Sequence, residues 1–296
     1  MGAYWRGTYN NFIDVTPSEK QAPLMGSWNE KYHGAMLEKG ENRNVSWVWK
    51  SGQNPTSVCV PSLDGSDMAE WEKNLMPVVK SLGKKNFNTT GDFNYKTFKG
   101  GFYTIGHSIA RTEEQPCEGA SDENLANIFS ACIALPDDKS VLYIHRAEMI
   151  GRFYVTELKD FCLKIPNDIF NDNKRTYTAN NNQKFTLDGY GSKKELINTN
   201  SNWLNIDNKI GVFSLTKDKD LFINRPGERK ASIKYMFSLK GNLFADEIVS
   251  QISEKTQIFP KDKEILTSAI LIRIENAEES RKSADTVNII YLKERR

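Results

Sequence analysis

The stretch Ser201 to Leu215, SNWLNIDNKIGVFSL, decides the fold. Its two apolar runs, Trp203 to Ile206 and Ile210 to Leu215, are separated by the polar corner Asp207-Asn208-Lys209. Short apolar runs on either side of turn residues are typical of a β-hairpin whose strands each bury one face. We therefore predict a hairpin at this position.

Short apolar runs also dominate the rest of the C-terminal half. Gly, Pro, Asp, Asn and Lys interrupt them, at the spacing expected of stacked antiparallel strands. The sequence therefore predicts an all-β fold, a large antiparallel β-sandwich. The runs are Leu221 to Asn224, Ala231 to Leu239, Leu243 to Ile252, Ile265 to Glu275 and Val287 to Leu292, and two more hairpins are expected from Ile128 to Met149 and from Arg175 to Leu187.

The first part of the chain has a different amino-acid composition. Residues 1 to 66 are rich in Asn, Gly and Pro with isolated aromatic residues, which predicts a loop-rich N-terminal segment packed on a sandwich domain of residues 67 to 296. One strand is expected there, at Val45 to Lys50, where Val45, Trp47 and Trp49 alternate with Ser46 and Val48.

One short helix is expected near residues 68 to 82. Asp67 and Glu70 have the spacing of a capping box, and apolar residues follow at helical intervals. Pro77 should kink this helix and Gly83 should end it. The polar residues 84 to 94 predict a loop, and residues 98 to 109 predict a strand around Gly100-Gly101.

Charge and hydropathy exclude two classes of partner. The chain has 40 Lys and Arg against 38 Asp and Glu, scattered along 296 residues, so no basic stripe for nucleic acid is present. No apolar run approaches the roughly 20 residues of a membrane span. Residues 1 to 6 also lack the apolar core of a signal peptide. We expect either a cytoplasmic protein or, preferably, a periplasmic or extracellular one whose targeting segment, with or without a preceding domain, lies outside this sequence.

The four cysteines are far apart in the sequence. Cys59, Cys117, Cys132 and Cys162 form no C-x-x-C pair, so a thiolate metal site is not expected. Burial as small apolar side chains is the main interpretation. One disulfide is the alternative in an oxidising compartment.

Several short stretches together suggest a family. They are LKIPNDIFN (Leu163 to Asn171), WLNIDNKIGVFSL (Trp203 to Leu215), INRPGER (Ile223 to Arg229) and AEES (Ala277 to Ser280). In this order they resemble the C-terminal, galactose-mutarotase-like β-sandwich region of bacterial polysaccharide-degrading enzymes. The resemblance covers roughly Trp47 to the end. It implies an α-toroid catalytic domain, and the long amphipathic helices of such a toroid do not occur in this sequence.

The segment from His107 to Glu118 is the densest in chemistry. We take His107, Glu113 and Glu118 as candidate catalytic residues, because glycoside cleavage uses paired carboxylates, and Arg111 as a candidate ligand for a uronate. The competing interpretation is a solvated acidic loop. A calcium site using Glu113, Glu114, Glu118 or Asp122 is a further alternative, although the spacing of a calcium-binding loop is absent, and no other cofactor is expected.

Aromatic residues and one histidine are the candidate substrate-binding groups. Trp28, Trp47 and Trp49 could stack on pyranose rings, and His33 lies in an irregular segment of the kind that often carries ligands. Trp203 and His145, by contrast, are expected to be structural residues of the sheet.

Three functions follow from these observations. The first is a β-sandwich module of a secreted carbohydrate-active protein that binds a polysaccharide or oligosaccharide, or helps to position it for a separate catalytic domain. The second is a self-contained glycoside hydrolase or polysaccharide lyase that uses His107 to Glu118. The third is a structural or adhesive surface module.

Overall fold

A computed structural model describes residues 25–30, 32, 34–50, 55–62, 68, 74–83, 85–113, 123–167, 171–180, 183–189, 194–226 and 245–293. In α2 the side chains are described as far as residue 286. Antiparallel strands dominate the described residues, so the all-β prediction is confirmed. No helix of the described chain is long and apolar enough to cross a membrane.

The largest element is a nine-stranded sheet. It contains the hairpin predicted at Trp203 to Leu215, in which Asp207 and Asn208 have φ angles of 49° and 58°. Positive φ at two successive residues is the condition for the type I′ turn that matches strand twist, and Asp and Asn tolerate it. In order across the sheet, the strands are β14 (Lys184–Asp188), β13 (Lys174–Thr178), β16 (Trp203–Ile206), β17 (Ile210–Ser214), β22 (Glu264–Ile274), β9 (Ser140–Met149), β8 (Glu123–Ala134), β7 (Gly101–Glu113) and β6 (Lys85–Phe98).

Four smaller sheets complete the described part of the chain. One contains β1 (Gly26–Glu30), β2 (Ala35–Lys39), β3 (Arg43–Val48) and β4 (Thr56–Pro61), and another β12 (Leu163–Pro166), β19 (Ala245–Val249), β18 (Phe222–Arg225) and β15 (Glu195–Asn198). The others are β20 (Ile252–Ser253), β11 (Glu157–Lys159) and β5 (Val78–Lys80), and the pair β10 (Phe153–Val155) and β21 (Gln257–Phe259).

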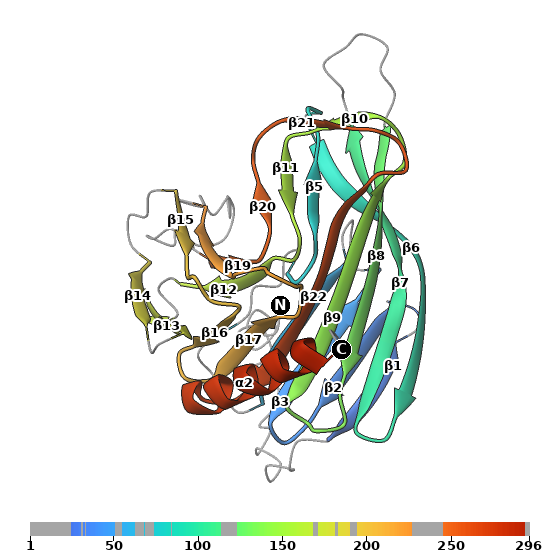
Figure 1. Cartoon of the computed structure of the whole chain (residues 1–296). Coiled ribbons are helices and arrows are strands. Elements are labelled where there is room, and N and C mark those ends of the chain that lie inside the picture. Colours follow the sequence, from blue (N-terminus) through green and yellow to red (C-terminus); the bar gives the residue numbers. More distant parts are fainter. Residues whose placement is uncertain are drawn as a thin grey trace, which may run out of the picture.

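The nine-stranded sheet has two faces with different coverings. Figure 1 shows β1 to β3 behind the long strands β6 to β9, and the helix α2 (Ala277–Lys293) in front of the sheet. We call the face toward β1–β4 the inner face and the face toward α2 the outer face. The nine-stranded sheet is therefore the middle layer: a second sheet covers one of its faces and a helix covers part of the other.

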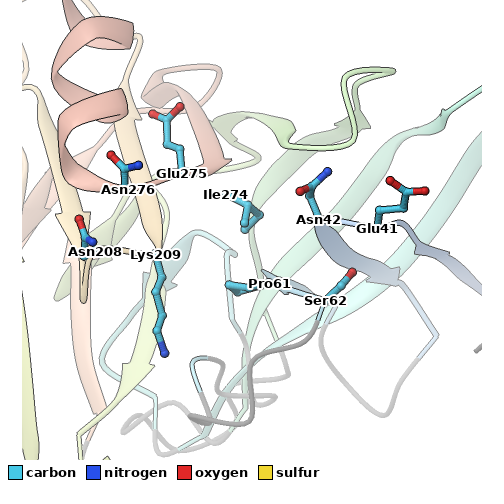
Figure 2. Close-up of a pocket in the computed structure, with 9 residues that line it drawn as sticks. All are labelled: Glu41, Asn42, Pro61, Ser62, Asn208, Lys209, Ile274, Glu275 and Asn276. Atoms are coloured by element: carbon cyan, nitrogen blue, oxygen red, sulfur yellow. The ribbon is translucent and has the colours of Figure 1, made fainter.

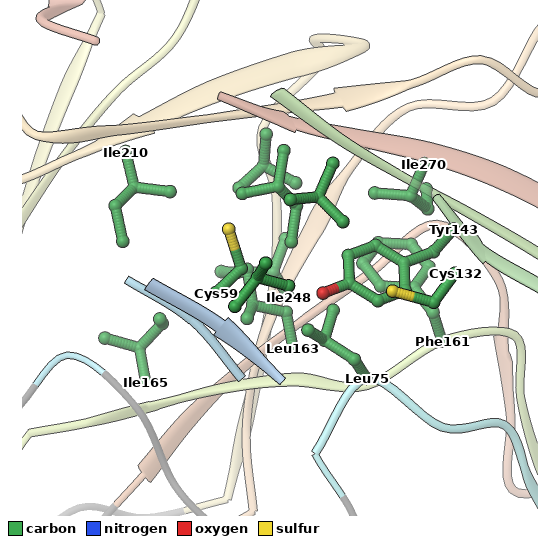
Figure 3. Close-up of a cluster of buried hydrophobic side chains, with 14 of the residues drawn as sticks. Cys59, Leu75, Cys132, Tyr143, Phe161, Leu163, Ile165, Ile210, Ile248 and Ile270 are labelled. Atoms are coloured by element: carbon green, nitrogen blue, oxygen red, sulfur yellow. The ribbon is translucent and has the colours of Figure 1, made fainter. Parts of the chain in front are cut away.

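The inner face contributes to the main core. Met36, Trp47 and Cys59 from the four-stranded sheet belong to one cluster with Cys132 and Tyr143 from the nine-stranded sheet. Leu163, Ile165 and Ile248 join it from the sheet containing β12, and Figure 3 shows these three with Cys59, Cys132 and Tyr143. Cys59, Cys132 and Cys162 are buried free thiols, as the main interpretation of the cysteines predicted. Burial raises the pKa of Cys59 to about 12, so this thiol is neutral and unreactive.

A buried arginine joins the two layers at one end. Arg43 on β3 donates to the Leu135 carbonyl at 2.6 Å, to the Ser140 carbonyl and to Glu38 Oε2 at 2.9 Å. These contacts connect the β2–β3 hairpin to the turn between β8 and β9. Burial raises the pKa of the Glu38 carboxyl, and the Arg43 charge opposes that shift.

The predicted helix at 68 to 82 is wrong over its described part. Leu75 has a φ of 58°, Met76 and Pro77 are irregular, and residues 78 to 80 form β5, which pairs with β11. Pro77 cannot continue a helix, and the β-branched Val78 and Val79 suit a strand, so pairing with β11 prevails over the helical spacing. Residues 69 to 73 lie outside the described chain.

The run Val287 to Leu292 was also misassigned, because its backbone belongs to α2 and not to a strand. The helix begins with a capping box: Asn276 Oδ1 accepts the Glu279 amide at 2.9 Å, and Glu279 Oε2 accepts the Asn276 amide at 3.0 Å. This Asn-x-x-Glu signal precedes the apolar run by eleven residues.

Two predicted loops are strands. The part of the chain expected to be mostly loop contains the four strands 26–30, 35–39, 43–48 and 56–61 of the four-stranded sheet, and most of the predicted loop at 84 to 94 lies in β6. Gly100 lies in the turn between β6 and β7 and has a φ of 77°. The strand predicted at 98 to 109 therefore begins in this turn, and only its part from residue 101 onward belongs to β7. The polar, Asn-rich composition of these strands misled the prediction, since pairing with neighbours overrides weak strand propensity.

Candidate functional site

The predicted catalytic segment lies mostly on β7. His107 is in the middle of this strand and Glu113 is its last residue, while Glu118 lies outside the described residues. Six residues of extended strand separate His107 from Glu113 by about 20 Å. The structure therefore does not bring His107 and Glu113 together in one reaction centre.

The two charged candidates at the end of β7 contact neighbours on β6. Glu113 forms an ion pair with Lys85 at 3.3 Å, and the Arg111 guanidinium lies 5.6 Å from the centre of the Phe87 ring. Both side chains are half-buried. Their contacts stabilise the β6–β7 pair at this end, which is a structural role for both.

Two predicted sugar platforms are core residues. Trp47 has no exposed surface and Trp49 is also buried; Trp47 lies 6.4 Å from the Tyr143 ring and Trp49 lies 5.8 Å from the Phe93 ring. A buried indole has no free face for a pyranose, so the assignment of Trp47 and Trp49 to substrate binding is corrected. The alternation of β3 predicted their shared face but could not show that a second sheet covers it.

Trp28 differs from these two residues. It is 42% exposed on the edge strand β1, opposite Leu37 on β2, so it stays a candidate platform. His33 lies outside the described residues. His145 is a buried sheet residue, as predicted, with Nδ1 3.0 Å from Ser130 Oγ, and burial lowers its pKa to about 3.

A pocket of about 520 Å³ opens where the β2–β3 turn, the β16–β17 turn and the start of α2 meet (Figure 2). The side chains of Glu41 and Glu275 lie on opposite sides of it, and the Glu275 carboxylate points toward α2. Glu275 Oε2 accepts Arg273 Nε at 2.8 Å, and Asn208 Oδ1 accepts the Ala277 amide at 2.8 Å. Asn208 thus holds the start of α2 and Glu275 is paired with Arg273, so these two groups do not form an acid and base pair aimed at a shared point. Its lining is Glu41, Asn42, Pro61, Ser62, Asn208, Lys209, Ile274, Glu275 and Asn276.

Metal ligands do not gather in the described part of the chain. No group of three or more His, Cys, Asp or Glu side chains there could hold a metal ion. Of the proposed calcium ligands, Glu113 binds Lys85, and residues 114, 118 and 122 lie outside the described chain.

The outer face of the nine-stranded sheet is the most distinctive surface. His107 on β7 is opposite Phe129 on β8, with the ring centres 6.2 Å apart, and Phe129 is opposite Arg146 on β9. Phe129 is 44% exposed. The next row contains Asn127 and Glu148, which are also opposite each other. We call His107, Asn127, Phe129, Arg146 and Glu148 the polar zone.

Ion pairs fix the charges of the polar zone. Arg146 Nη2 lies 2.7 Å from Glu148 Oε2, and Arg146 Nε lies 2.9 Å from Oε2 of Glu264 on β22. Because two carboxylates flank the guanidinium, its charge is already compensated. The zone therefore suits uncharged hydroxyl groups better than an anionic ligand.

Sequence reasoning identified His107 but missed Phe129 and Arg146. A signal was available in residues 101 to 110 and 123 to 134, where aliphatic and aromatic residues occupy both alternating positions. A strand with one solvated face should alternate apolar and polar residues, so this departure indicates that the outer face has a function or a cover.

Comparison with known proteins adds no family assignment. The sequence matches no protein-family model and no curated protein.

Proposed function

We propose that this chain is a β-sandwich module of a secreted or periplasmic carbohydrate-active protein, and that it binds polysaccharide across the polar zone of the outer face. The observation that carries the proposal is the exposed Phe129 ring placed between His107 and Arg146 on neighbouring strands. A pyranose ring has apolar C–H faces and a rim of hydroxyl groups, so it needs a flat apolar partner with donors and acceptors beside it.

The dimensions of the zone favour a chain over a single sugar. His107, Phe129, Arg146 and Thr267 occupy one row across β7, β8, β9 and β22. Three strand spacings make this row about 14 Å long. An extended oligosaccharide crossing the strands would contact the whole row.

Charge supports neutral glycans as the ligand class. Arg146 is shared between Glu148 and Glu264, so a uronate would meet two carboxylates for each guanidinium. Like charges in such proximity oppose binding. The resemblance to polysaccharide-degrading enzymes supports the wider class but does not choose the sugar.

Binding rather than turnover is the activity proposed for the chain. Among the described candidates, His107 and Glu113 are about 20 Å apart, and Glu113 is paired with Lys85. Catalysis requires two or more groups held in a fixed geometry, whereas weak binding to an open surface does not. A dissociation constant on the order of millimolar, about 4 kcal/mol, is expected.

The test is a titration of the full chain with neutral and acidic glycans, in which binding is measured by calorimetry or by changes in NMR chemical shift. Phe129→Ala should weaken binding of the neutral glycans about tenfold, as expected for a loss of about 1.4 kcal/mol of ring stacking. Tyr154→Ala is the matched control, because Tyr154 is an exposed aromatic residue on β10, outside the polar zone. Equal affinity in the parent and Phe129→Ala would exclude this site.

Turnover assays separate the proposal from the enzyme alternative. Reducing ends and unsaturated-uronate absorbance are measured for the parent chain and for the double variant Glu113→Gln, Glu118→Gln. We expect no turnover. Turnover by the parent that is lost in the double variant would instead support a self-contained hydrolase or lyase.

A further inference from the structure

A second part of the outer face, adjoining the polar zone, is apolar. Two rows cross β7, β8, β9 and β22 there: Tyr103, Ile133, Leu142 and Leu271 in the first, and Ile105, Ala131, Ile144 and Ala269 in the second. We call these eight residues the apolar zone. Contiguous apolar surface of this kind is uncommon on monomeric proteins and marks an interaction site.

The second row alternates between large and small side chains. Ile105 and Ile144 are 53% and 41% exposed, while Ala131 between them and Ala269 beyond them are half-buried. Neighbouring strands are about 4.8 Å apart, so the row forms ridges about 10 Å apart with hollows between them. If a second copy of this row faces the first and is displaced by one strand, each isoleucine ridge lies opposite an alanine hollow.

The apolar zone is continuous with a covered surface. Its first row extends from Leu271 to Phe213 on β17 and then to Trp203 on β16. There Ala284 of α2 packs against Trp203 and Phe213, which are buried. This face of the sheet therefore already accepts one apolar layer, and the apolar zone continues it over β7, β8 and β9.

We propose that the apolar zone is an interface between two copies of this chain, packed face to face and displaced by one strand so that Ile105 and Ile144 of each copy enter the hollows of the other. The alternating row favours a second copy as the occupant, because a second copy carries the same period of ridges and hollows. No residue of the zone is charged, so two copies can approach without repulsion between like charges. Sheets that pack face to face lie about 10 Å apart, a distance that interdigitated side chains of this size fill.

The zone also sets the strength of the association. Stable specific interfaces use about 20 to 30 residues from each partner. Eight residues with their immediate neighbours are fewer than that, so we expect a reversible dimer with a dissociation constant of about 10 μM or weaker.

Sedimentation velocity of the full chain over a wide concentration range tests this proposal without a glycan. The parent should change from monomer to dimer as its concentration rises. The double variant Ile105→Asp, Ile144→Asp should stay monomeric, because it buries uncompensated charge in the interface. Ile258→Asp is the matched control: Ile258 has similar exposure on β21, outside the zone, and its change should leave dimerisation intact.

A further variant separates the packed interface from general stickiness. Ala131→Leu makes the surface more apolar but fills the central hollow, so it should weaken the dimer at least about tenfold, the effect of about 1.4 kcal/mol of overpacking. A parent that is monomeric at every concentration, a double Asp variant that still dimerises, or stronger association in Ala131→Leu would each overturn the proposal. Glycan affinity enters none of these measurements, so this proposal and the glycan proposal fail separately.

Discussion

The inner and outer faces of the nine-stranded sheet are built by alternate residues of the same strands, yet neither face is uniformly apolar or uniformly polar. The inner face buries polar side chains such as Ser130, His145 and Ser268, which lie in one row across β8, β9 and β22. The outer face exposes Ile105 and Ile144. The comparison shows that the hydropathy of a single residue does not tell whether it is buried, because the cover placed on each face also decides this.

The largest effects should come from truncating one aromatic side chain in each environment. Trp47→Ala, on the strand β3 that covers the inner face, and Trp203→Ala under α2 should each lower the free energy of unfolding by about 3 to 5 kcal/mol, because both rings are buried. Phe129→Ala on the open outer face should change it by less than about 1 kcal/mol. Chemical denaturation of the three variants measures these values.

Two outcomes of these measurements would contradict the assignment of covered and open parts of the sheet. A small effect of Trp203→Ala would mean that α2 does not make this part of the outer face a core. A large effect of Phe129→Ala would mean that the open part of the face is covered in solution by something other than α2.

The hairpins were predictable because their information is local. Asp207 and Asn208 specify a turn, and the apolar runs on either side specify two strands that must lie next to each other. The strand β5 could not be predicted in the same way. Its residues Val78 to Lys80 pair with β11 almost 80 positions later, and helical spacing within residues 68 to 82 carries no information about that partner.

The candidate site was only partly predictable for the same physical reason. The sequence indicates that Val45, Trp47 and Trp49 share a face, but only the packing of the two sheets shows that this face is closed. His107 was identified from its chemistry. Its partners Phe129 and Arg146 come from two later strands, and their place beside it depends on the register of three strands.

An intermediate effect on the free energy of unfolding should come from protonation of His145 on the inner face. Burial lowers the pKa of His145 to about 3, and a backbone hydrogen bond with Leu75 opposes this shift. Below about pH 6.5 the unfolded chain binds a proton at this histidine that the folded chain does not bind. The free energy of unfolding should therefore fall by about 1.4 kcal/mol for each pH unit between pH 6 and pH 4.5.

Denaturation curves of the parent and His145→Gln at pH 7, 6 and 5 measure this slope. The variant should lose most of the decrease between pH 6 and pH 5, whatever its stability at pH 7. Carboxyl groups whose pKa is lowered by ion pairs, such as Glu157 beside Lys80 and Lys159, lose their contribution below this window and are common to both proteins. Parallel pH profiles would mean that water reaches His145 and that the inner face is less dry than its burial indicates.

The smallest effect concerns the start of the helix that covers part of the outer face. Asn276→Ala removes the side-chain oxygen that accepts the Glu279 amide, leaving one of the first amides of α2 without that partner. The cost should be about 1 kcal/mol in the free energy of unfolding. Glu279→Gln is the matched control, because glutamine can still accept the Asn276 amide and complete the capping box.

The two variants should therefore differ in their free energy of unfolding, with Glu279→Gln close to the parent. Equal losses in both would mean that the charge of Glu279 at the helix start contributes as much as the Asn276 side-chain acceptor. No loss in either would mean that contacts of α2 with Trp203 and Phe213 hold the helix without its cap, and the covered part of the outer face would then depend on packing alone.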